Sequence, residues 1–296
     1  MLQNLKNIRT DLISSFTDEK ISCGLLRLDL LHPVVSGNKW FKLRFYLADA
    51  LLQGKTTIAS FGGAYSNHLV AMAHACKTMG LSAVGIVRGE APDILSHTLR
   101  EAISYGMEPV FVPRSNYKNK ALLQKELNQP NWYWIEEGGY GLKGAEGAAT
   151  ILDTVDKEDY TDIICAVGTG TMMAGLIKSI NANQRVTGIS VLKNHHSVLT
   201  EVNALLNDSD QSKTYSVVPG YHFGGYAKHP NQLIDFMNEC WKEQKIPTDI
   251  VYTSKLLFAV RDLIKQHYFK PASKLLIIHS GGLQGNYSLP AGKLIF

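Results

Sequence analysis

Short apolar runs alternate with longer stretches in which apolar residues recur at helical spacing. In the first half, strands are predicted at 57–61, 83–87, 110–112 and 132–135. The stretches between them predict helices at 67–79, from Pro92-Asp93 to Gly106, and at 118–127. Pro in the first turn and Gly just past the last turn mark the second of these helices. This strand–helix order predicts a parallel sheet covered by helices.

The second half repeats the pattern. Strands are predicted at 162–167, 186–192, 216–218, 250–252 and 275–278, and helices at 172–180, 231–244 and 255–268. No sequence repeat, low-complexity tract or flexible linker is evident. We therefore expect two closely packed α/β domains with a cleft between them. Ligands of such sheets bind beyond the carboxyl ends of the strands.

Composition narrows the functional classes. The 296 residues are 45% apolar and 19% charged, as in globular proteins, and the net charge of +4 does not indicate nucleic-acid binding. The four cysteines are scattered without a C-x-x-C pair, so we expect free buried thiols and no metal site. Residues 1–11 show no signal peptide and no apolar run is long enough to span a bilayer, so a cytoplasmic protein is expected.

The most informative segment is Ser36-Gly37-Asn38-Lys39, followed by an apolar, helix-like run. A lysine near a helix N-terminus feels the positive end of the helix dipole, which favours its neutral amine. A neutral lysine can form a Schiff base with a carbonyl cofactor. Taken alone, however, a lysine in front of a helix is most often solvated.

Two further segments follow predicted strands. Gly62-Gly63-Ala64-Tyr65-Ser66-Asn67-His68 leads into a helix whose free N–H groups could bind a carboxylate, although Ser66 and Asn67 could equally be helix caps. His68 could be a structural histidine beside the apolar face. Gly168-Thr169-Gly170-Thr171 suits a small phosphate, or is simply a tight turn, and it lacks a third glycine of the dinucleotide motif.

These segments together resemble the fold-type II pyridoxal-phosphate (PLP) enzymes related to the tryptophan synthase β subunit. More narrowly, they are similar to the 1-aminocyclopropane-1-carboxylate (ACC) deaminase and D-cysteine desulfhydrase family. The resemblance runs from about residue 25 to 285. Besides the segments above, it rests on Lys42-Leu43, Val251-Tyr252-Thr253-Ser254-Lys255 and His279-Ser280-Gly281-Gly282. It implies two open, mostly parallel α/β domains with the cofactor in the cleft: a large domain of residues 1–44 and 141–296, and a smaller one of 45–140.

The resemblance also implies roles for individual residues. Lys39 would carry the Schiff base with PLP, and Ser66, Tyr226 and Tyr252 would complete the catalytic set. Asn67 would hydrogen-bond the phenolic oxygen of the cofactor. The substrate carboxylate would bind at Ser66, Asn67 and His68. The other implied cofactor contacts are the phosphate turn and two hydroxyl residues: Gly168, Thr169, Gly170, Thr171, Thr253 and Ser280.

Two positions separate the branches of this family. ACC deaminases carry a glutamate after the tyrosine that Tyr252 matches, and a leucine before the C-terminal glycine pair. This chain has Thr253 and Ser280, as desulfhydrase-like members have hydroxyl residues there. The chain departs from the family in Gly138-Gly139-Tyr140-Gly141, where Gly-Gly-Ser-Asn is usual, and in being rather short.

The expected function is therefore PLP-dependent deamination of a small amino acid by α,β-elimination, similar to the reaction of D-cysteine desulfhydrase. The products would be a 2-oxo acid and ammonia, with sulfide when cysteine is the substrate. ACC deamination is the alternative, and a PLP- or nucleotide-binding protein without turnover is a second one. Related enzymes tend to be homodimers, and no nucleic-acid or membrane partner is expected.

Overall fold

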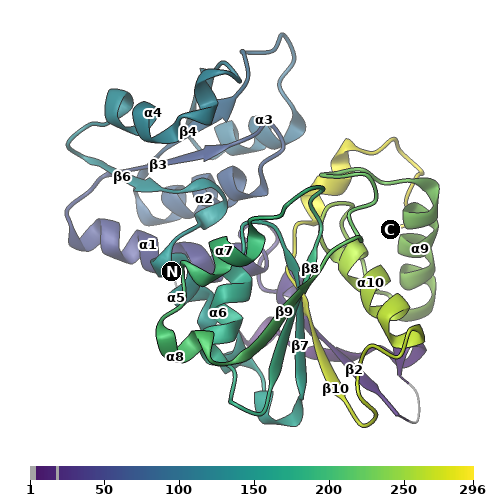
Figure 1. Ribbon diagram of the computed structural model, residues 1–296. Coiled ribbons are helices and arrows are strands. Elements are labelled where there is room, and N and C mark those ends of the chain that lie inside the picture. The colour runs from purple at the N-terminus through teal and green to yellow at the C-terminus, as the bar shows by residue number, and fades with distance from the viewer. Residues whose placement is uncertain (1–4, 18–19) are drawn as a thin grey trace.

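The protein, described here by a computed structural model of residues 5–17 and 20–296, has two lobes, each built around its own sheet (Figure 1). The smaller sheet has four strands in the order β5-β4-β3-β6, and all its neighbours are parallel. Its strands are β3 (Thr57–Gly62), β4 (Ser82–Arg88), β5 (Met107–Val112) and β6 (Trp132–Ile135).

The larger sheet has the order β1-β2-β10-β7-β8-β9. Only the edge strand β1 runs antiparallel to its neighbour, among the described residues. The strands are β1 (Thr10–Leu12), β2 (Ser22–Arg27), β7 (Asp162–Val167), β8 (Arg185–Ser190), β9 (Thr214–Val218) and β10 (Lys274–His279). This arrangement confirms the expected α/β class with mostly parallel sheets.

Helices cover both faces of the larger sheet because its strands are apolar on both sides. On β7, Ile163 and Cys165 belong to one core cluster, whereas Ile164 and Ala166 belong to another. Figure 1 shows α5 and α6 on one face and α9 and α10 on the other. The helices are α1 (Asn38–Leu52), α2 (Asn67–Met79), α3 (His97–Ser104), α4 (Lys120–Leu127), α5 (Leu142–Ala149), α6 (Thr171–Ser179), α7 (Val198–Asn203), α8 (Asp208–Gln211), α9 (Asn231–Gln244) and α10 (Thr253–Lys265).

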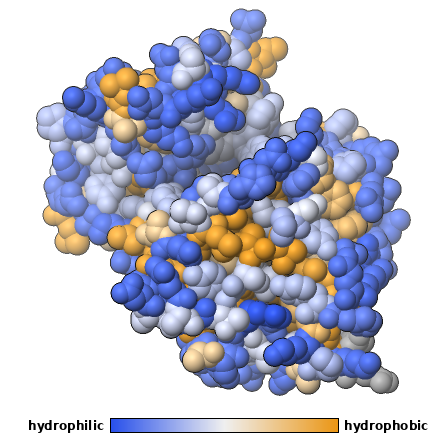
Figure 2. Space-filling view, in the orientation of Figure 1, coloured by the Kyte–Doolittle hydropathy of each residue, from blue (hydrophilic) through white to orange (hydrophobic). Residues whose placement is uncertain are grey.

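The first of these clusters continues into the smaller lobe through α1 and α2. It includes Phe41 of α1, Ile58 of β3 and Val70 of α2, together with Ile163 of the larger sheet. The two lobes therefore share one continuous core. The surface is hollowed between the lobes in the space-filling view (Figure 2).

Most predicted elements are present, with ends shifted by a few residues, but the strand expected at 250–252 is wrong. These residues form a turn that leads into α10. The carboxylate of Asp249 accepts hydrogen bonds from the N–H groups of Val251 (2.8 Å), Tyr252 (3.0 Å) and Thr253 (2.8 Å). With its N–H groups directed at one side chain, the segment cannot join a strand ladder.

The proposed domain boundaries stay a prediction. All four strands of the smaller sheet fall within residues 45–140, and those of the larger sheet fall outside them. Residues 1–4 and 18–19 of the proposed large domain lie outside the described part of the chain. The four cysteines are free and buried, as expected. Among the described residues, the helices are too short or too polar to cross a membrane.

Each sheet has a point at which the strand order reverses. In the larger sheet it lies between β7 and β10, and in the smaller sheet it lies between β3 and β6. Open α/β sheets bind ligands beyond the carboxyl ends of the strands at such reversal points. The loops after these four strands are the glycine-rich segments singled out in the sequence.

Candidate active site

Loops from both reversal points meet at one cavity. Gly168, Thr169 and Gly170 follow β7, Ser280 follows β10, and Gly138 follows β6. The start of α1 closes the cavity from a third side. Its complete lining is Asn38, Lys39, Lys42, Gly138, Ala166, Val167, Gly168, Thr169, Gly170, Met172, Met173, Tyr252 and Ser280. Of the predicted site residues, Lys39, Gly168, Thr169, Gly170, Tyr252 and Ser280 thus line one space.

A tight contact between two loops fixes the start of α1. The N–H of Asn38 donates to the carbonyl of Ser280 at 3.3 Å. Gly37 has φ +62°, and a Cβ there would lie 1.9 Å from the same carbonyl oxygen. Only glycine tolerates both this conformation and this approach. The small-residue turn in the sequence is therefore what places Lys39 opposite Ser280.

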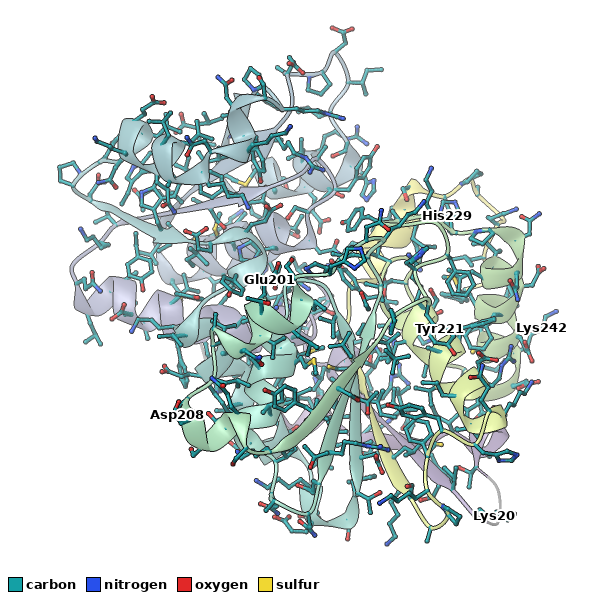
Figure 3. All side chains as sticks on the ribbon, viewed as in Figure 1. Lys20, Glu201, Asp208, Tyr221, His229 and Lys242 are labelled. Atoms are coloured by element: carbon teal, nitrogen blue, oxygen red, sulfur yellow. The ribbon has the colours of Figure 1, made fainter. Side chains whose placement is uncertain are left out.

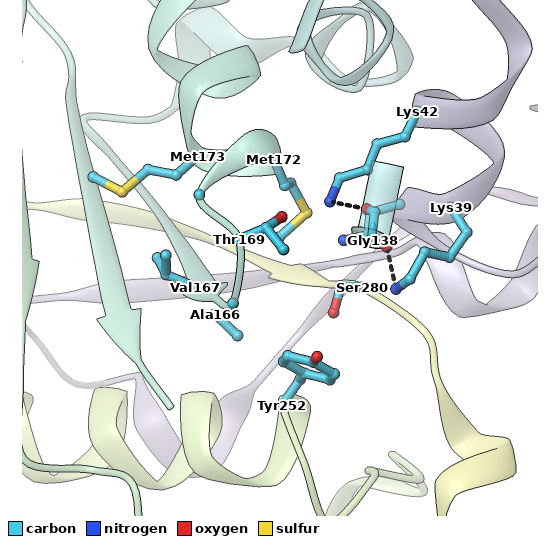
Figure 4. A pocket seen from close by; sticks show the side chains of 13 residues that line it. Lys39, Lys42, Gly138, Ala166, Val167, Thr169, Met172, Met173, Tyr252 and Ser280 are labelled. Atoms are coloured by element: carbon cyan, nitrogen blue, oxygen red, sulfur yellow. Dashed lines mark hydrogen bonds between the residues drawn. The ribbon is translucent and has the colours of Figure 1, made fainter. Parts of the chain in front are cut away.

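Lys39 and Lys42 extend from the same face of α1 into the cavity, as Figure 4 shows. The amine of Lys42 lies on the side of Thr169 and Met172 and donates to the carbonyl of Gly138 at 3.4 Å. The amine of Lys39 lies on the side of Tyr252 and Ser280, 5.8 Å from the centre of the Tyr252 ring. It donates to Asn38 Oδ1 at 2.8 Å. The two amines therefore face different ends of the cavity.

Both lysines are held in an environment that disfavours their charge. Burial lowers the pKa of Lys39 from 10.5 to about 8, against the opposing effect of the Asp249 carboxylate. Burial, followed by the charge of Lys39, lowers the pKa of Lys42 to about 7. The ion pairs of the described residues include neither lysine. Two buried amines without a paired carboxylate predict an anionic ligand between them and the glycine turn.

The glycine turn after β7 adds the N-terminus of a helix to this end of the cavity. α6 begins at Thr171, and Gly170 before it has φ +77°. A Cβ on Gly170 would also lie 2.8 Å from Val202 Cγ2, so larger residues are disfavoured there. The hydroxyls of Thr169 and Thr171 lie 3.0 Å apart. Helix N-termini with hydroxyl neighbours bind phosphate through free N–H groups.

The start of α2 lies on the other side of the cleft. Ser66 caps this helix, because its Oγ accepts from the N–H of Leu69 at 3.3 Å. The amide nitrogen of Asn67 makes a long hydrogen bond of 3.4 Å to the carbonyl of Gly282, and its buried Oδ1 has no partner. The side chain of Asn67 thus has spare hydrogen-bonding capacity between the lobes.

His68 lies deeper than the predicted substrate contact requires. It is 3% exposed, and its Nε2 is 2.9 Å from Ser60 Oγ. Burial and the charges of Lys39 and Lys42 lower its pKa to about 3, so the ring is neutral. It does not appear in the cavity lining given above. This position favours the structural alternative for His68, and its substrate role stays a prediction.

The two predicted tyrosines differ in exposure. Tyr252 lines the cavity, and burial followed by the neighbouring Tyr226 and Asp249 raises its pKa well above the usual value. Tyr226 is 50% exposed and is not among the residues that line the cavity, but it is close enough to Tyr252 to affect the pKa of that residue. Burial raises the pKa of Tyr226 as well. Both hydroxyls therefore stay protonated at neutral pH and can donate.

The two predicted hydroxyl residues, Thr253 and Ser280, make different contacts. Thr253 is buried, and its hydroxyl lies 2.7 Å from Asp249 Oδ1 and accepts from the N–H of Asp249 at 2.7 Å. Ser280 lines the cavity beside Lys39. Ser280 is therefore the hydroxyl residue better placed to contact a bound ring.

The sequence reasoning did not assign roles to Lys42, Gly138 and Asp249. Lys42 follows Lys39 by three residues, a spacing that puts both on one helix face, so this signal was available. Gly138 and Asp249 gave no such signal, because their importance depends on loops that meet only in the folded chain.

These residues fit pyridoxal phosphate. The turn at 168–171, the N-terminus of α6 and Lys42 suit the phosphate. Lys39 suits the aldehyde carbon, because its lowered pKa makes a neutral amine accessible. The unpaired amide oxygen of Asn67 and the hydroxyl of Ser280 remain for the polar atoms of the ring.

Comparison with known proteins agrees with this fit. The family described as pyridoxal-phosphate dependent enzyme matches residues 6–281. A Thermotoga maritima protein, provisionally named an ACC deaminase, is 30% identical over 285 residues, with coverage of 88% of this chain and 89% of that protein. The mitochondrial bifunctional D-cysteine desulfhydrase/ACC deaminase of Arabidopsis thaliana is 25% identical, with coverage of 88% and 72%. A crystal structure of an ACC deaminase homologue shares the fold, with a TM-score of 0.79, 23% identity and coverage of 95% and 90%.

Proposed function

Because this chain belongs to the family of pyridoxal-phosphate-dependent enzymes, we propose that it deaminates a small β-substituted amino acid by α,β-elimination, as D-cysteine desulfhydrase does. With D-cysteine and water, the products are pyruvate, ammonia and hydrogen sulfide. The observation that carries this proposal is the cavity in which the amine of Lys39 faces Tyr252 and Ser280, while that of Lys42 faces the glycine turn.

Bound PLP supplies an aldehyde for the lysine and a ring that withdraws electrons from the substrate Cα. Lys39 is our candidate for the base that takes the Cα proton onto Nζ, because burial lowers its pKa to about 8. Ser66 is the alternative. Its oxygen already accepts from the N–H of Leu69, which makes it the weaker base of the two.

The substrate carboxylate is proposed to bind at the start of α2. There the first N–H groups of the helix lack intrahelical partners, and the hydroxyl proton of Ser66 is free to donate. Asn67 lies beside this point and reaches across the cleft to Gly282. The N-terminus of α2 carries no acidic residue in its first turn, which suits an anionic substrate group.

Two observations bear on the choice of reaction. Several relatives carry the ACC deaminase name, which favours that reaction as the alternative. The absence of a carboxylate at position 253 favours elimination, because ACC deaminases carry a glutamate there and a neutral hydroxyl cannot stabilise a protonated pyridine as a carboxylate does. A weaker electron sink suffices when thiolate or chloride leaves from Cβ, whereas opening a cyclopropane ring needs more assistance.

The decisive experiment measures kcat/KM for D-cysteine, L-cysteine and ACC by 2-oxo acid release. We expect D-cysteine, or 3-chloroalanine as a test compound, to be turned over faster than ACC. A preference for ACC would overturn the elimination proposal and leave the PLP family intact. Absence of any turnover, with an absorption band that borohydride abolishes, would favour a PLP-binding protein. The homodimer and the cytoplasmic location stay predictions. Light scattering of the purified protein tests the homodimer.

A further inference from the structure

Lys255 is a fully buried lysine to which the proposed chemistry gives no role. It is 0% exposed and stands third in α10, where the helix dipole opposes its charge. Burial lowers its pKa from 10.5 to about 8, against the opposing effect of the Asp249 carboxylate. A buried cation at this position destabilises the fold unless hydrogen bonds compensate for its lost hydration.

The amine of Lys255 donates to two carbonyls of one loop. These belong to His222, at 3.0 Å, and to Gly225, at 2.8 Å. Each carbonyl also accepts a backbone N–H that closes a turn: Gly225 N–H donates to His222 at 3.0 Å, and Lys228 N–H donates to Gly225 at 3.2 Å. Lys255 therefore links two successive turns that share Gly225, the residue directly before Tyr226.

The backbone of this loop is strained. Phe223, Gly224, Gly225 and Ala227 all have positive φ, at 52°, 97°, 135° and 53°. Phe223 and Ala227 carry a Cβ and therefore rarely adopt this region, so the loop conformation is unfavourable on its own. Strained residues persist only where surrounding contacts determine the conformation.

Other contacts hold the ends of the loop. The hydroxyl of Tyr221 donates to Asp262 of α10 at 2.7 Å, and the ring of Phe223 packs edge-on against Phe258 at 4.9 Å. His229 Nδ1 lies 2.7 Å from the carbonyl of Ala227. Figure 3 shows Tyr221 and His229 on the segment that runs along the rim of the larger lobe toward the smaller one. Lys255 supplies the hydrogen bonds to the middle of the loop.

We propose that Lys255 is a positioning residue that clamps the strained loop 222–227 and thereby holds Tyr226 near Tyr252 of the active site. Half-exposed Tyr226 has no recorded side-chain hydrogen bond among the described residues, so its place depends on the backbone that carries it. The catalytic part of this inference rests on the proposed elimination reaction, whereas the clamp itself does not.

The clamp is tested by hydrogen–deuterium exchange of the holoenzyme, read at residues 222–228. Lys255→Met keeps the side-chain length and removes the donors. We expect at least about tenfold faster exchange in this loop and unchanged exchange in β7. Lys228→Met is the matched control, because Lys228 follows the same loop and its amine makes no hydrogen bond among the described residues. Equal protection of the loop in wild type and Lys255→Met would overturn the clamp.

The catalytic consequence is tested by a double-mutant cycle with 3-chloroalanine. Lys255→Met should lower kcat at least about tenfold, since misplaced catalytic groups act with that size of effect. The same change on a Tyr226→Phe background should cost less than about twofold, because the group that Lys255 positions is already absent. Equal losses on both backgrounds would refute action through Tyr226. If Tyr226→Phe alone retains full activity, the proposed role of Tyr226 fails, while the exchange result still decides the clamp.

Folding is controlled with circular dichroism and a second variant. Lys255→Gln retains a shorter donor and should show intermediate exchange. Should neither variant fold, wild-type exchange decides the question. The clamp requires the N–H groups of Gly225 and Lys228 to exchange as slowly as the first hydrogen-bonded turn of α10. Loss of their protection within seconds would refute it.

Discussion

Replacing Lys42 by methionine should have two effects of opposite sign: a more stable cofactor-free protein and a weaker hold on PLP. Lys42 is 5% exposed, and burial together with Lys39 lowers its pKa from 10.5 to about 7. A lysine whose folded pKa is lowered destabilises the fold wherever its unfolded form is still protonated. The penalty is full below pH 7, shrinks as the pH rises from 7, and vanishes above about 10.5.

The magnitude follows from the shift. Lowering the pKa of Lys42 from 10.5 to about 7 costs the fold at most about 5 kcal/mol of stability, and about 4 kcal/mol at pH 7. Methionine keeps most of the side-chain volume, so cofactor-free Lys42→Met should unfold several degrees higher at pH 7 and gain little at pH 10. In the holoenzyme the variant lacks a charged donor to phosphate. That loss is about 1.5–3 kcal/mol, or about 10- to 150-fold in the dissociation constant of PLP.

The assay combines scanning fluorimetry of cofactor-free protein at pH 7 and 10 with equilibrium dialysis of PLP. Lys77→Met is the control, because Lys77 is exposed on α2. Its amine makes a long 3.5 Å hydrogen bond to the carbonyl of Ser104 and lies 5.8 Å from the centre of the Tyr105 ring. This variant should change neither quantity. A lower unfolding temperature of Lys42→Met with unchanged PLP affinity would show that Lys42 supports the fold and has no part in anion binding.

Three further changes separate the parts of the site. Borohydride reduction followed by peptide mapping should find the pyridoxyl group on Lys39, and Lys39→Ala should abolish nearly all turnover; a label on Lys42 would contradict the assignment. Gly168→Ala places a methyl group 3.2 Å from Tyr252 Cε1 and should weaken PLP retention in dialysis about tenfold, with the unfolding temperature of the cofactor-free protein unchanged. Unaltered retention would mean that the turn only connects β7 to α6. Ser280→Ala should shift the PLP absorption band and slow 3-chloroalanine elimination about tenfold, and identical spectra would remove Ser280 from the ring contacts.

Much of the fold could be predicted because parallel strands that are buried on both faces leave clear apolar runs. The run at 162–167 forms β7, since its residues alternate between two cores and all are buried. The stop signal Gly80 ends α2 in a left-handed conformation, as glycine after a helix predicts. Such signals are local, so the sequence alone reveals them.

Sequence patterns are insufficient where a distant or polar contact decides the structure. The run at 250–252 is apolar enough for a strand, yet the carboxylate of Asp249 binds its N–H groups and turns it into a helix start. The role of His68 stays a prediction for the same reason: its motif indicates a substrate contact, whereas in the structure its Nε2 lies 2.9 Å from Ser60 Oγ inside the core. Residue type and spacing cannot decide between these outcomes, because each depends on whether a second group is buried nearby.

The same distinction separates the two hydroxyl residues that mark the branch of the family. Thr253 donates hydrogen bonds to Asp249 through its hydroxyl and its N–H. These bonds fix the start of α10, and with it the position of Tyr252, the residue directly before Thr253. Glutamate at 253 would bring a second carboxylate against Asp249 in a fully buried place, and a loss of activity would report on folding as much as on the ring. Ser280 lines the cavity, and its hydroxyl is not hydrogen-bonded to Asp249 among the described residues. A substitution that tests the choice between elimination and ring opening is therefore better made at Ser280. A change at Thr253 would also disturb the geometry of the helix start.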